Sequence, residues 1–336
     1  MKTDITVVKA SHLQPFISFL DKVGAPLERL LNQVNLHADY FSDKDNLIAE
    51  APFWSLLENA SNSQGIEDLG FQVTEQLSLD SFGVFGAKVM QADSLYQALT
   101  TFISDMGQQS NCPPFWLMEQ GAFVWFCRLG TQGIKKGHWP IEQHVISLMI
   151  QLVRGFTSTT WTPPKVHLQT HTLKGADDTA SFSNSQILIN KAFTGICIPK
   201  SLLLNSAVIK PKDGVAGEVA SHMIISTVNS HVIKELLMQS CANQRFNAQQ
   251  IAKSLGLNIR HMQRLLKEEG CSYRELSEQV LFKQSQVMLS AEQFSVLEVS
   301  LALGYSDAAN FTRAFKRWSG LSPTQYKQSL NNSFCR

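Results

Sequence analysis

The sequence predicts an α+β domain followed by an all-α domain. Hydrophobic residues up to about position 205 follow two periods, one typical of amphipathic helices and one typical of short strands. From about residue 229 onward only the helical period remains. Between them, residues 205–219 contain proline, glycine and two lysines without clear periodicity, which is typical of a linker, and we place the linker at residues 206–229. We therefore expect one domain over residues 1–205 and a second over residues 230–330.

The composition fits a globular protein without a membrane span. Of the 336 residues, 44% are hydrophobic and 17% are charged, which suits two or three domains with buried cores. The most apolar segment, residues 145–153, is about half as long as a bilayer requires. The amino-terminal MKTDITVVKA carries Asp4 and no long apolar stretch, so we expect no signal peptide. Six scattered cysteines without a C-x-x-C pair predict free thiols in a reducing cytoplasm, with neither a disulfide framework nor a zinc site.

The net charge of +1 conceals an asymmetry between the two halves. Residues 1–230 hold 16 Lys and Arg against 20 Asp and Glu, a net charge of −4. Residues 231–336 hold 13 against 8, a net charge of +5. This asymmetry indicates that only the carboxy-terminal part meets a polyanion.

The first hundred residues show short amphipathic helices separated by breaks. Apolar residues recur at three- and four-residue spacing, and Pro26 and Pro52 lie where first helical turns are expected. The longest of these helices is expected to begin at a capping Asp93 or Ser94. The expected helices cover residues 13–23, 26–34, 52–61, 67–77 and 93–106.

Short strands are expected around one buried helix. Residues on either side of Gln120 and Gly121 have strand character, which predicts a β-hairpin. The segment 205–219 is the strongest linker candidate and is expected to run into a connecting helix over residues 216–240. The expected strands lie in residues 115–130, 165–170 and 185–199, and the buried helix covers residues 141–156.

The basic half contains two similar blocks, residues 247–270 and 295–320. Each has a short helix, a tight glycine turn and a polar-capped amphipathic helix. This is the plan of a helix-turn-helix, whose second helix enters the major groove of DNA. Gly256 and Gly304 lie 48 positions apart, whereas Arg264 and Arg313 lie 49 apart. We therefore place one extra residue at the start of the second helix of the second block.

The second helix of each block is predicted to have an apolar face and an opposite cationic face. Asn258 is expected to cap this helix in the first block, and Ser306 or Asp307 in the second. An apolar face requires a core, whereas a cationic face suits a polyanion or water. The apolar faces comprise Ile259, Met262, Leu265 and Leu266 in the first block and Phe311, Phe315 and Trp318 in the second.

Residues 230–330 resemble the DNA-binding domain of the AraC/XylS family of bacterial transcription regulators. The resemblance rests on LGYSDAANFTRAFKRWSGLSPTQY, residues 303–326. It implies a seven-helix unit in which a long helix, residues 273–290, holds two helix-turn-helix subdomains apart. Their recognition helices would then lie in successive major grooves on one face of the duplex. One departure is Ala308 and Ala309, where family members often carry longer polar side chains.

The front half resembles the amino-terminal domain of an AraC subfamily with an arabinose-binding-like domain. The segments that carry this resemblance are FGVFGAKVMQADSLYQALTTFISDM, residues 82–106, and ICIPKSLL, residues 196–203. The resemblance implies an effector-binding or dimerisation domain, and its name implies no sugar. The implied partners are promoter DNA, RNA polymerase, a small-molecule effector and a second copy of the chain. We expect no cofactor and no membrane partner.

We expect the cationic faces to contact DNA. Base reading is expected of Arg260, Gln263 and Arg264, because arginine can bind guanine and glutamine can bind adenine through paired hydrogen bonds. The alternative for each is a solvated side chain or a phosphate contact, and phosphate is the interpretation we favour for the lysines and Arg317. The predicted DNA-facing residues are Arg260, His261, Gln263, Arg264, Lys267, Ala309, Asn310, Thr312, Arg313, Lys316 and Arg317.

Candidate effector residues are the aromatic and cationic side chains of the front domain, for which a plain core or surface role is the alternative. His167 and His171 would lie about 13 Å apart on a strand, so we expect no metal there. Cys127 and Cys197 are expected to be buried thiols. The effector candidates are Trp116, Trp125, Arg128, Arg154 and Lys200.

Two other classes of function stay open at this point. One is a regulator controlled by a protein partner instead of an effector. The other is an enzyme or repair protein that carries this DNA-binding module, although the sequence shows no catalytic motif in context. An apolar cavity in the front domain would favour a sensor, whereas shifted titratable groups around a nucleophile would favour an enzyme.

Overall fold

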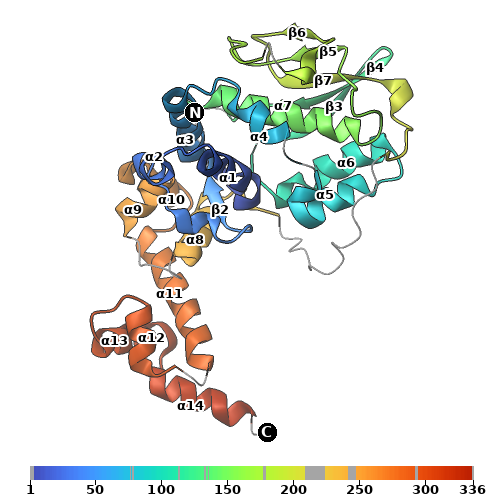
Figure 1. Cartoon of the computed structure of the whole chain (residues 1–336). Helices are drawn as coiled ribbons and strands as arrows, with labels where there is room; N and C mark the ends of the chain where they lie inside the picture. The colour runs from blue at the N-terminus through green and yellow to red at the C-terminus, as the bar shows by residue number, and fades with distance from the viewer. Residues whose placement is uncertain are drawn as a thin grey trace. The chain divides into compact units, whose positions relative to one another are not determined.

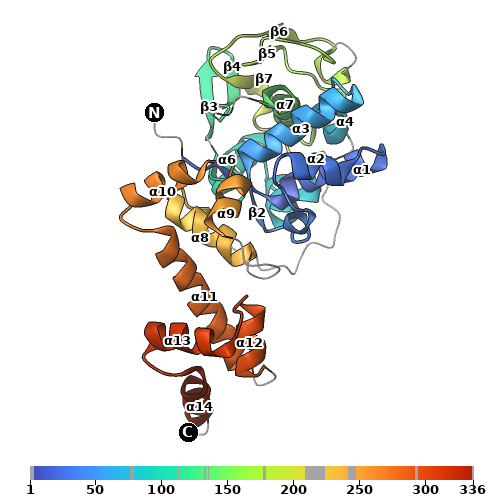
Figure 2. The same cartoon turned by 90° about the vertical axis from the view of Figure 1, so that its left-hand side faces the viewer.

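The computed structural model divides the chain into two compact units, Met1–Thr227 and Val228–Arg336, called here the front unit and the back unit. It describes residues 4–75, 77, 79–112, 114–131, 134, 136–176, 179–208, 224–240, 247–291 and 294–334. Figure 1 and Figure 2 give two views of the elements. Most of the predicted linker, residues 209–223, lies outside the described residues.

The front unit begins with a two-stranded sheet and short helices. Strand β1 (Val7–Lys9) pairs antiparallel with β2 (Leu47–Ala49), a pairing that the sequence analysis did not predict. Helix α5 (Gly83–Met90) was also not predicted as a separate element. The remaining helices agree with the prediction within a few residues, and Ser94 is the cap of α6 because its hydroxyl accepts a hydrogen bond from the Gln97 amide. These helices are α1 (Gln14–Lys22), α2 (Leu27–Gln33), α3 (Glu50–Gln64), α4 (Leu69–Glu75), α6 (Leu95–Asp105) and α7 (His138–Arg154).

Five strands form the main sheet of the front unit in the order β3-β4-β7-β5-β6. All neighbours are antiparallel except β5 and β6, which are parallel. The predicted hairpin is confirmed, with β3 and β4 joined through Gly121 at a positive φ of 59°. The strands are β3 (Phe115–Gln120), β4 (Phe123–Arg128), β5 (Lys165–His167), β6 (Gln186–Leu188) and β7 (Thr194–Pro199). Short 3₁₀ turns connect several elements: η1 (Ala10–His12), η2 (Ala38–Phe41), η3 (Leu79–Phe82), η4 (Met106–Gln108), η5 (Ala180–Phe182) and η6 (Lys200–Leu202).

Strand alternation gives the sheet two faces with different roles. Phe126 of β4 points to the face covered by α7, where it joins Ile146 and Ile150 in one core. Figure 1 shows α7 beneath the sheet, with α5 and α6 below it. Trp125 and Cys127 point to the other face, where they form a separate small cluster with Cys197. Position parity along β4 therefore decides which side chains can reach the interior between the sheet and the helices.

Every regular element described in the back unit is a helix, and the predicted fold class is confirmed. Helix α11 has the predicted bounds, Tyr273–Ser290. Of the connecting helix predicted over residues 216–240, residues 216–223 lie outside the described residues. Helix α8 begins at Asn229, and residues 224–228 are not helical. Figure 2 shows α8, α9 and α10 at one end of α11 and α12, α13 and α14 at the other. The other helices are α8 (Asn229–Ser240), α9 (Ala248–Ser254), α10 (Ile259–Glu268), α12 (Val296–Ala302), α13 (Ala308–Ser319) and α14 (Pro323–Phe334).

Within the described residues, none of the helices combines the length and the apolar character needed to cross a bilayer.

Candidate nucleic-acid interface and buried cavity

The first helix pair of the back unit, α9 and α10, is fixed by local capping. Asn247 and Gln250 form a capping box that begins α9. Asn258 begins α10 as predicted, because its Oδ1 accepts a hydrogen bond from the His261 amide at 2.8 Å. Gly256 lies between the helices at a φ of 69°, a conformation that glycine adopts without strain.

The faces of α10 agree with the prediction except at two positions. Met262, Leu265 and Leu266 are buried, but Ile259 is 37% exposed because it lies in the first turn, ahead of the core that the others form. His261 is half-buried, and its Nε2 has no hydrogen-bond partner among the described residues, so its side chain does not share the exposed face. The exposed side chains of this helix include Arg260, Gln263, Arg264 and Lys267.

The second pair, α12 and α13, repeats this design with a longer turn. Ser295 begins α12 through a capping box, 48 positions after Asn247. Asp307, one of the two predicted caps, begins α13 and accepts a hydrogen bond from the Asn310 amide at 2.7 Å. Asp307 follows Asn258 by 49 positions, so the extra residue lies in the turn and not in the helix start, where we had placed it.

Helix α13 presents the predicted apolar and polar faces. Phe311 and Phe315 are fully buried, and half-buried Trp318 packs against the same core. Thr312 is half-buried at the edge of the polar face. The exposed residues of α13 include Ala309, Asn310, Arg313, Lys316 and Arg317.

A glutamate of α11 holds α13 in place. Glu278 accepts a hydrogen bond from Arg317 at 2.9 Å and one from the Trp318 indole at 3.4 Å. The same carboxylate accepts from Arg274, one turn earlier on α11, at 3.1 Å. Burial raises the pKa of Glu278, but the hydrogen bonds and charges of these partners outweigh it and leave the pKa below its ordinary value. Arg317 is therefore bound to protein in this structure.

The five candidate effector residues of the front unit lie in different places. Trp116 and Trp125 belong to the cluster on the outer face of the sheet. Arg154 donates from Nε to the Trp161 carbonyl at 2.8 Å, and Lys200 forms an ion pair with Glu119 at 2.6 Å. Arg128 alone of the five lines the cavity of the front unit.

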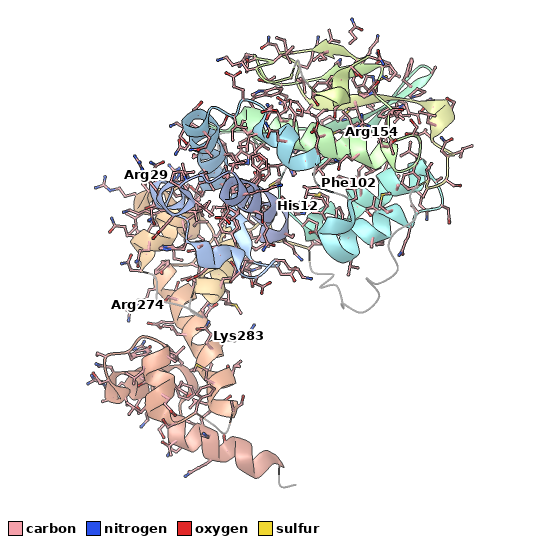
Figure 3. All side chains as sticks on the ribbon, viewed as in Figure 1. His12, Arg29, Phe102, Arg154, Arg274 and Lys283 are labelled. Atoms are coloured by element: carbon pink, nitrogen blue, oxygen red, sulfur yellow. The ribbon has the colours of Figure 1, made fainter. Side chains whose placement is uncertain are left out.

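This cavity has a volume of about 90 Å³ and a mostly apolar wall. It lies between the inner face of β3 and β4, helix α7 and the first segments of the chain, so residues far apart in sequence meet there. In Figure 3, His12 of η1 and Phe102 of α6 mark two of the segments that contribute to its wall. The largest side chains of the wall are Phe16, Trp54, Phe82, Phe85, Phe102 and Phe115.

Several buried polar groups also line the cavity. Burial lowers the pKa of His12 to about 4 and that of His144 to about 3. Burial likewise raises the pKa of the Cys112 thiol, and the nearby Glu50 carboxylate raises it further. At neutral pH the two imidazoles and the thiol therefore carry no charge.

No cluster of three or more potential metal ligands occurs in the part of the chain that the structure describes. His167 packs against Trp125, with the rings tilted by 35° and their centroids 4.1 Å apart, and His171 contacts the Asn190 side chain. The four cysteines described, Cys112, Cys127, Cys197 and Cys271, are free.

Comparison with protein families decides the relationship of the chain. Residues 24–206 match the arabinose-binding domain of AraC transcription regulators, and this match covers more than half of the 336 residues. The chain belongs to the AraC family. Residues 251–329 also match a helix-turn-helix domain; the match begins within α9 and covers the rest of both helix pairs of this AraC-family chain.

Individual curated relatives match less than a third of this chain. The HTH-type transcriptional regulator VqsM of Pseudomonas aeruginosa is 34% identical over 97 residues, which is 29% of this chain and 30% of VqsM. The Msm operon regulatory protein of Streptococcus mutans is 33% identical over 84 residues, or 25% of this chain and 30% of that protein. The chain thus matches less than a third of the length of these relatives. The solved structure of the regulator CdpR from P. aeruginosa matches 95% of this chain and 98% of its own, at 17% identity and a TM-score of 0.44.

Sequence reasoning missed several residues of this AraC-family chain that the structure brings together. Glu278 had one local signal, its i, i+4 spacing from Arg274, but its partners on α13 lie 39 and 40 positions away. His12, Glu50 and His144 had none, because each reaches the cavity from a different segment.

Proposed function

We propose that this AraC-family chain is a sequence-specific DNA-binding transcription regulator whose back unit binds promoter DNA. The observation that carries the proposal is the repeated helix pair with one buried apolar face and one exposed cationic face. The side chains of Arg260, Lys267 and Lys316 on these faces have no hydrogen-bond or ion-pair partner among the described residues. Exposed cations on the second helix of a helix-turn-helix suit phosphates and base edges.

The predicted contacts divide into base reading and phosphate binding. Arg260, Gln263 and Arg264 are proposed to read bases from α10, with Thr312 and Arg313 in the same role on α13. Ala309 can touch only thymine methyl groups or allow close approach, so we expect α13 to discriminate bases less sharply. Asn310 donates a hydrogen bond to Asp307 and accepts one from Arg313. We propose that its role is to orient the Arg313 side chain. The proposed phosphate contacts are Lys267 and Lys316, and His261 and Arg317 are reassigned to packing and to the bond with Glu278.

The front unit is proposed to receive a signal and to support dimerisation. We propose domains over residues 1–205 and 230–330, a linker over 206–229, a cytoplasmic location, and RNA polymerase as a further partner. An apolar cavity supports an effector as the signal, in preference to control by a protein partner. The raised pKa of Cys112 is opposite to what a thiolate nucleophile requires, so the cavity favours a sensor over an enzyme.

The proposal is tested by binding-site selection with the full chain, followed by two matched variants. Arg264→Ala should cost about 1–3 kcal/mol on the selected site and relax the preference at one or two base pairs. Lys316→Ala should weaken binding to all sequences alike and reduce the dependence of log affinity on log salt by about one.

The selected site should span roughly two helical turns, because two recognition helices meet successive major grooves. If both variants lose as much affinity for random DNA as for the selected site, the proposal that Arg264 reads bases is wrong. Failure of the full chain to select any sequence would overturn the proposed function itself.

A further inference from the structure

Arg128 is a buried cation that forms no ion pair with any described residue. Its side chain is 6% exposed, at the end of β4 on the face that looks toward α7. None of the described residues forms a hydrogen bond or an ion pair with its guanidinium. The nearest recorded contact is the ring of Phe115, whose centroid lies 5.9 Å from Cζ. Burying a charge without a partner costs free energy. An anion that pairs with Arg128 offsets a large part of that cost, which favours anion binding.

The other polar groups around the cavity are engaged or neutral. Glu50 Oε2 accepts a hydrogen bond from the Thr131 hydroxyl at 2.6 Å. His12 Nε2 lies 3.3 Å from Gln109 Oε1, and His144 Nδ1 lies 2.7 Å from Thr74 Oγ1. Both imidazoles are neutral at pH 7 because burial depresses their pKa. Arg128 is therefore the one cation in the described cavity wall, and Glu50 the one anion.

The volume and the apolar walls of the cavity limit the size and polarity of a ligand that carries the anionic group. A volume of about 90 Å³ exceeds the roughly 10–15 Å³ that one water needs, but is below the roughly 300–1,000 Å³ of pockets for drug-sized ligands. A second hollow of about 480 Å³, with a more polar lining, also reaches Arg128, Trp54 and Ile141. Arg128 thus stands where a polar hollow meets an apolar cavity.

We propose that the cavity binds a small monocarboxylate, with its carboxylate on the Arg128 guanidinium and its short hydrocarbon body between the phenylalanine rings. The planar guanidinium fork fits a carboxylate through two parallel hydrogen bonds. The apolar wall takes the hydrocarbon part, and its polar groups other than Arg128 already form hydrogen bonds or close polar contacts within the protein, which disfavours a sugar or a polyanion. This inference rests on the proposed role of the front unit as a sensor, and it names the class of effector.

The test measures thermal unfolding of the full chain with acetate, butanoate, hexanoate, octanoate and benzoate, each against its neutral amide. We expect the melting temperature to rise with the logarithm of concentration for at least one short carboxylate, and not for its amide. Arg128→Met should reduce the affinity about ten- to a hundredfold, as expected for loss of hydrogen bonds to a charged group. Arg154→Met is the matched control, because it removes a half-buried arginine outside the cavity and should leave the affinity unchanged.

Arg128→Met should itself fold, because it removes an unpaired buried charge. If that variant fails to fold, the acid-against-amide comparison on the unaltered chain still decides. Equal stabilisation by an acid and its amide, or none by any of the acids, overturns the proposal. Either result is compatible with intact selection of a DNA site, whereas loss of DNA selection with carboxylate binding retained would overturn the proposed function alone.

Discussion

His144 is an imidazole held inside the front unit of the molecule. Its Nδ1 lies 2.7 Å from the Thr74 hydroxyl, and its ring centroid lies 4.9 Å from that of Phe16. Burial, and then the nearby His12 and Arg128, lower its pKa from 6.5 to about 3. Between pH 6.5 and about 3 the imidazole is protonated in the unfolded chain but not in the folded chain. Proton binding therefore favours unfolding in that pH range.

We expect the free energy of unfolding of the front unit to fall as the pH is lowered from 6.5 toward 3. The slope should reach at most about 1.4 kcal/mol per pH unit for each of His12 and His144. Urea unfolding followed by tryptophan fluorescence checks this, since five of the six tryptophans lie in the front unit. His144→Gln should have a shallower slope below pH 6.5, and an unchanged slope would contradict the assignment.

At the scale of the element, α13 depends on a contact made outside itself. Its cap and its apolar core fix where it begins and which face is buried, but Glu278 of α11 fixes its far end through Arg317 and Trp318. A recognition helix must hold its side chains in register with the base edges. The exposed side of α13 is therefore oriented in part by α11, a helix to which we assign no base-reading residue.

Glu278→Gln should weaken binding to the selected DNA site about two- to fivefold, the range expected for a partly exposed ion pair. Arg274→Gln is the control, because it removes a partner of Glu278 without touching α13. DNA affinity measured by fluorescence anisotropy at fixed salt distinguishes them. The same loss in both variants, or none in either, would show that Glu278 does not orient α13.

Local signals explain which elements the sequence revealed. Asn258 and the Asp307 alternative were visible as caps, because a capping side chain bonds an amide only three positions away. The pairing of β1 with β2, the hydrogen bonds of Glu278 to α13 and the gathering of His12, Glu50 and Arg128 around one cavity join segments tens of residues apart. No periodicity records such contacts, since they depend on how whole elements pack. The sequence therefore indicated both Arg128 and Arg154 as effector candidates, with no local signal to prefer Arg128.

At the scale of the whole molecule, each unit has a core of its own. The front unit buries its side chains around α7 and around α3, and part of the back unit buries Phe311 and Phe315 against α11. A ligand stabilises only the unit that binds it, unless the other unit is coupled to that unit. Stability can therefore report which unit each partner uses.

Calorimetry of the full chain should resolve two unfolding transitions, one for each unit. Butanoate should raise the temperature of one transition and a duplex with the selected site should raise that of the other. Trp318 is the only tryptophan of the back unit, so Trp318→Phe identifies its transition by fluorescence. A single transition whose calorimetric and van't Hoff enthalpies agree would contradict this expectation.

The longer turn of the second helix pair has a consequence for the geometry of promoters. Gly304 and its cap are separated by one residue more than Gly256 and its cap, and the two second helices carry different side chains. Under the proposed function these two unlike helices read DNA and cannot exchange places, so the DNA sequence that they recognise is not symmetric and has a direction along the duplex. Turning such a sequence end for end turns the bound protein with it. A surface of the bound protein that faces upstream in one orientation of the site faces downstream in the other. The effect of the site on transcription should therefore depend on its orientation.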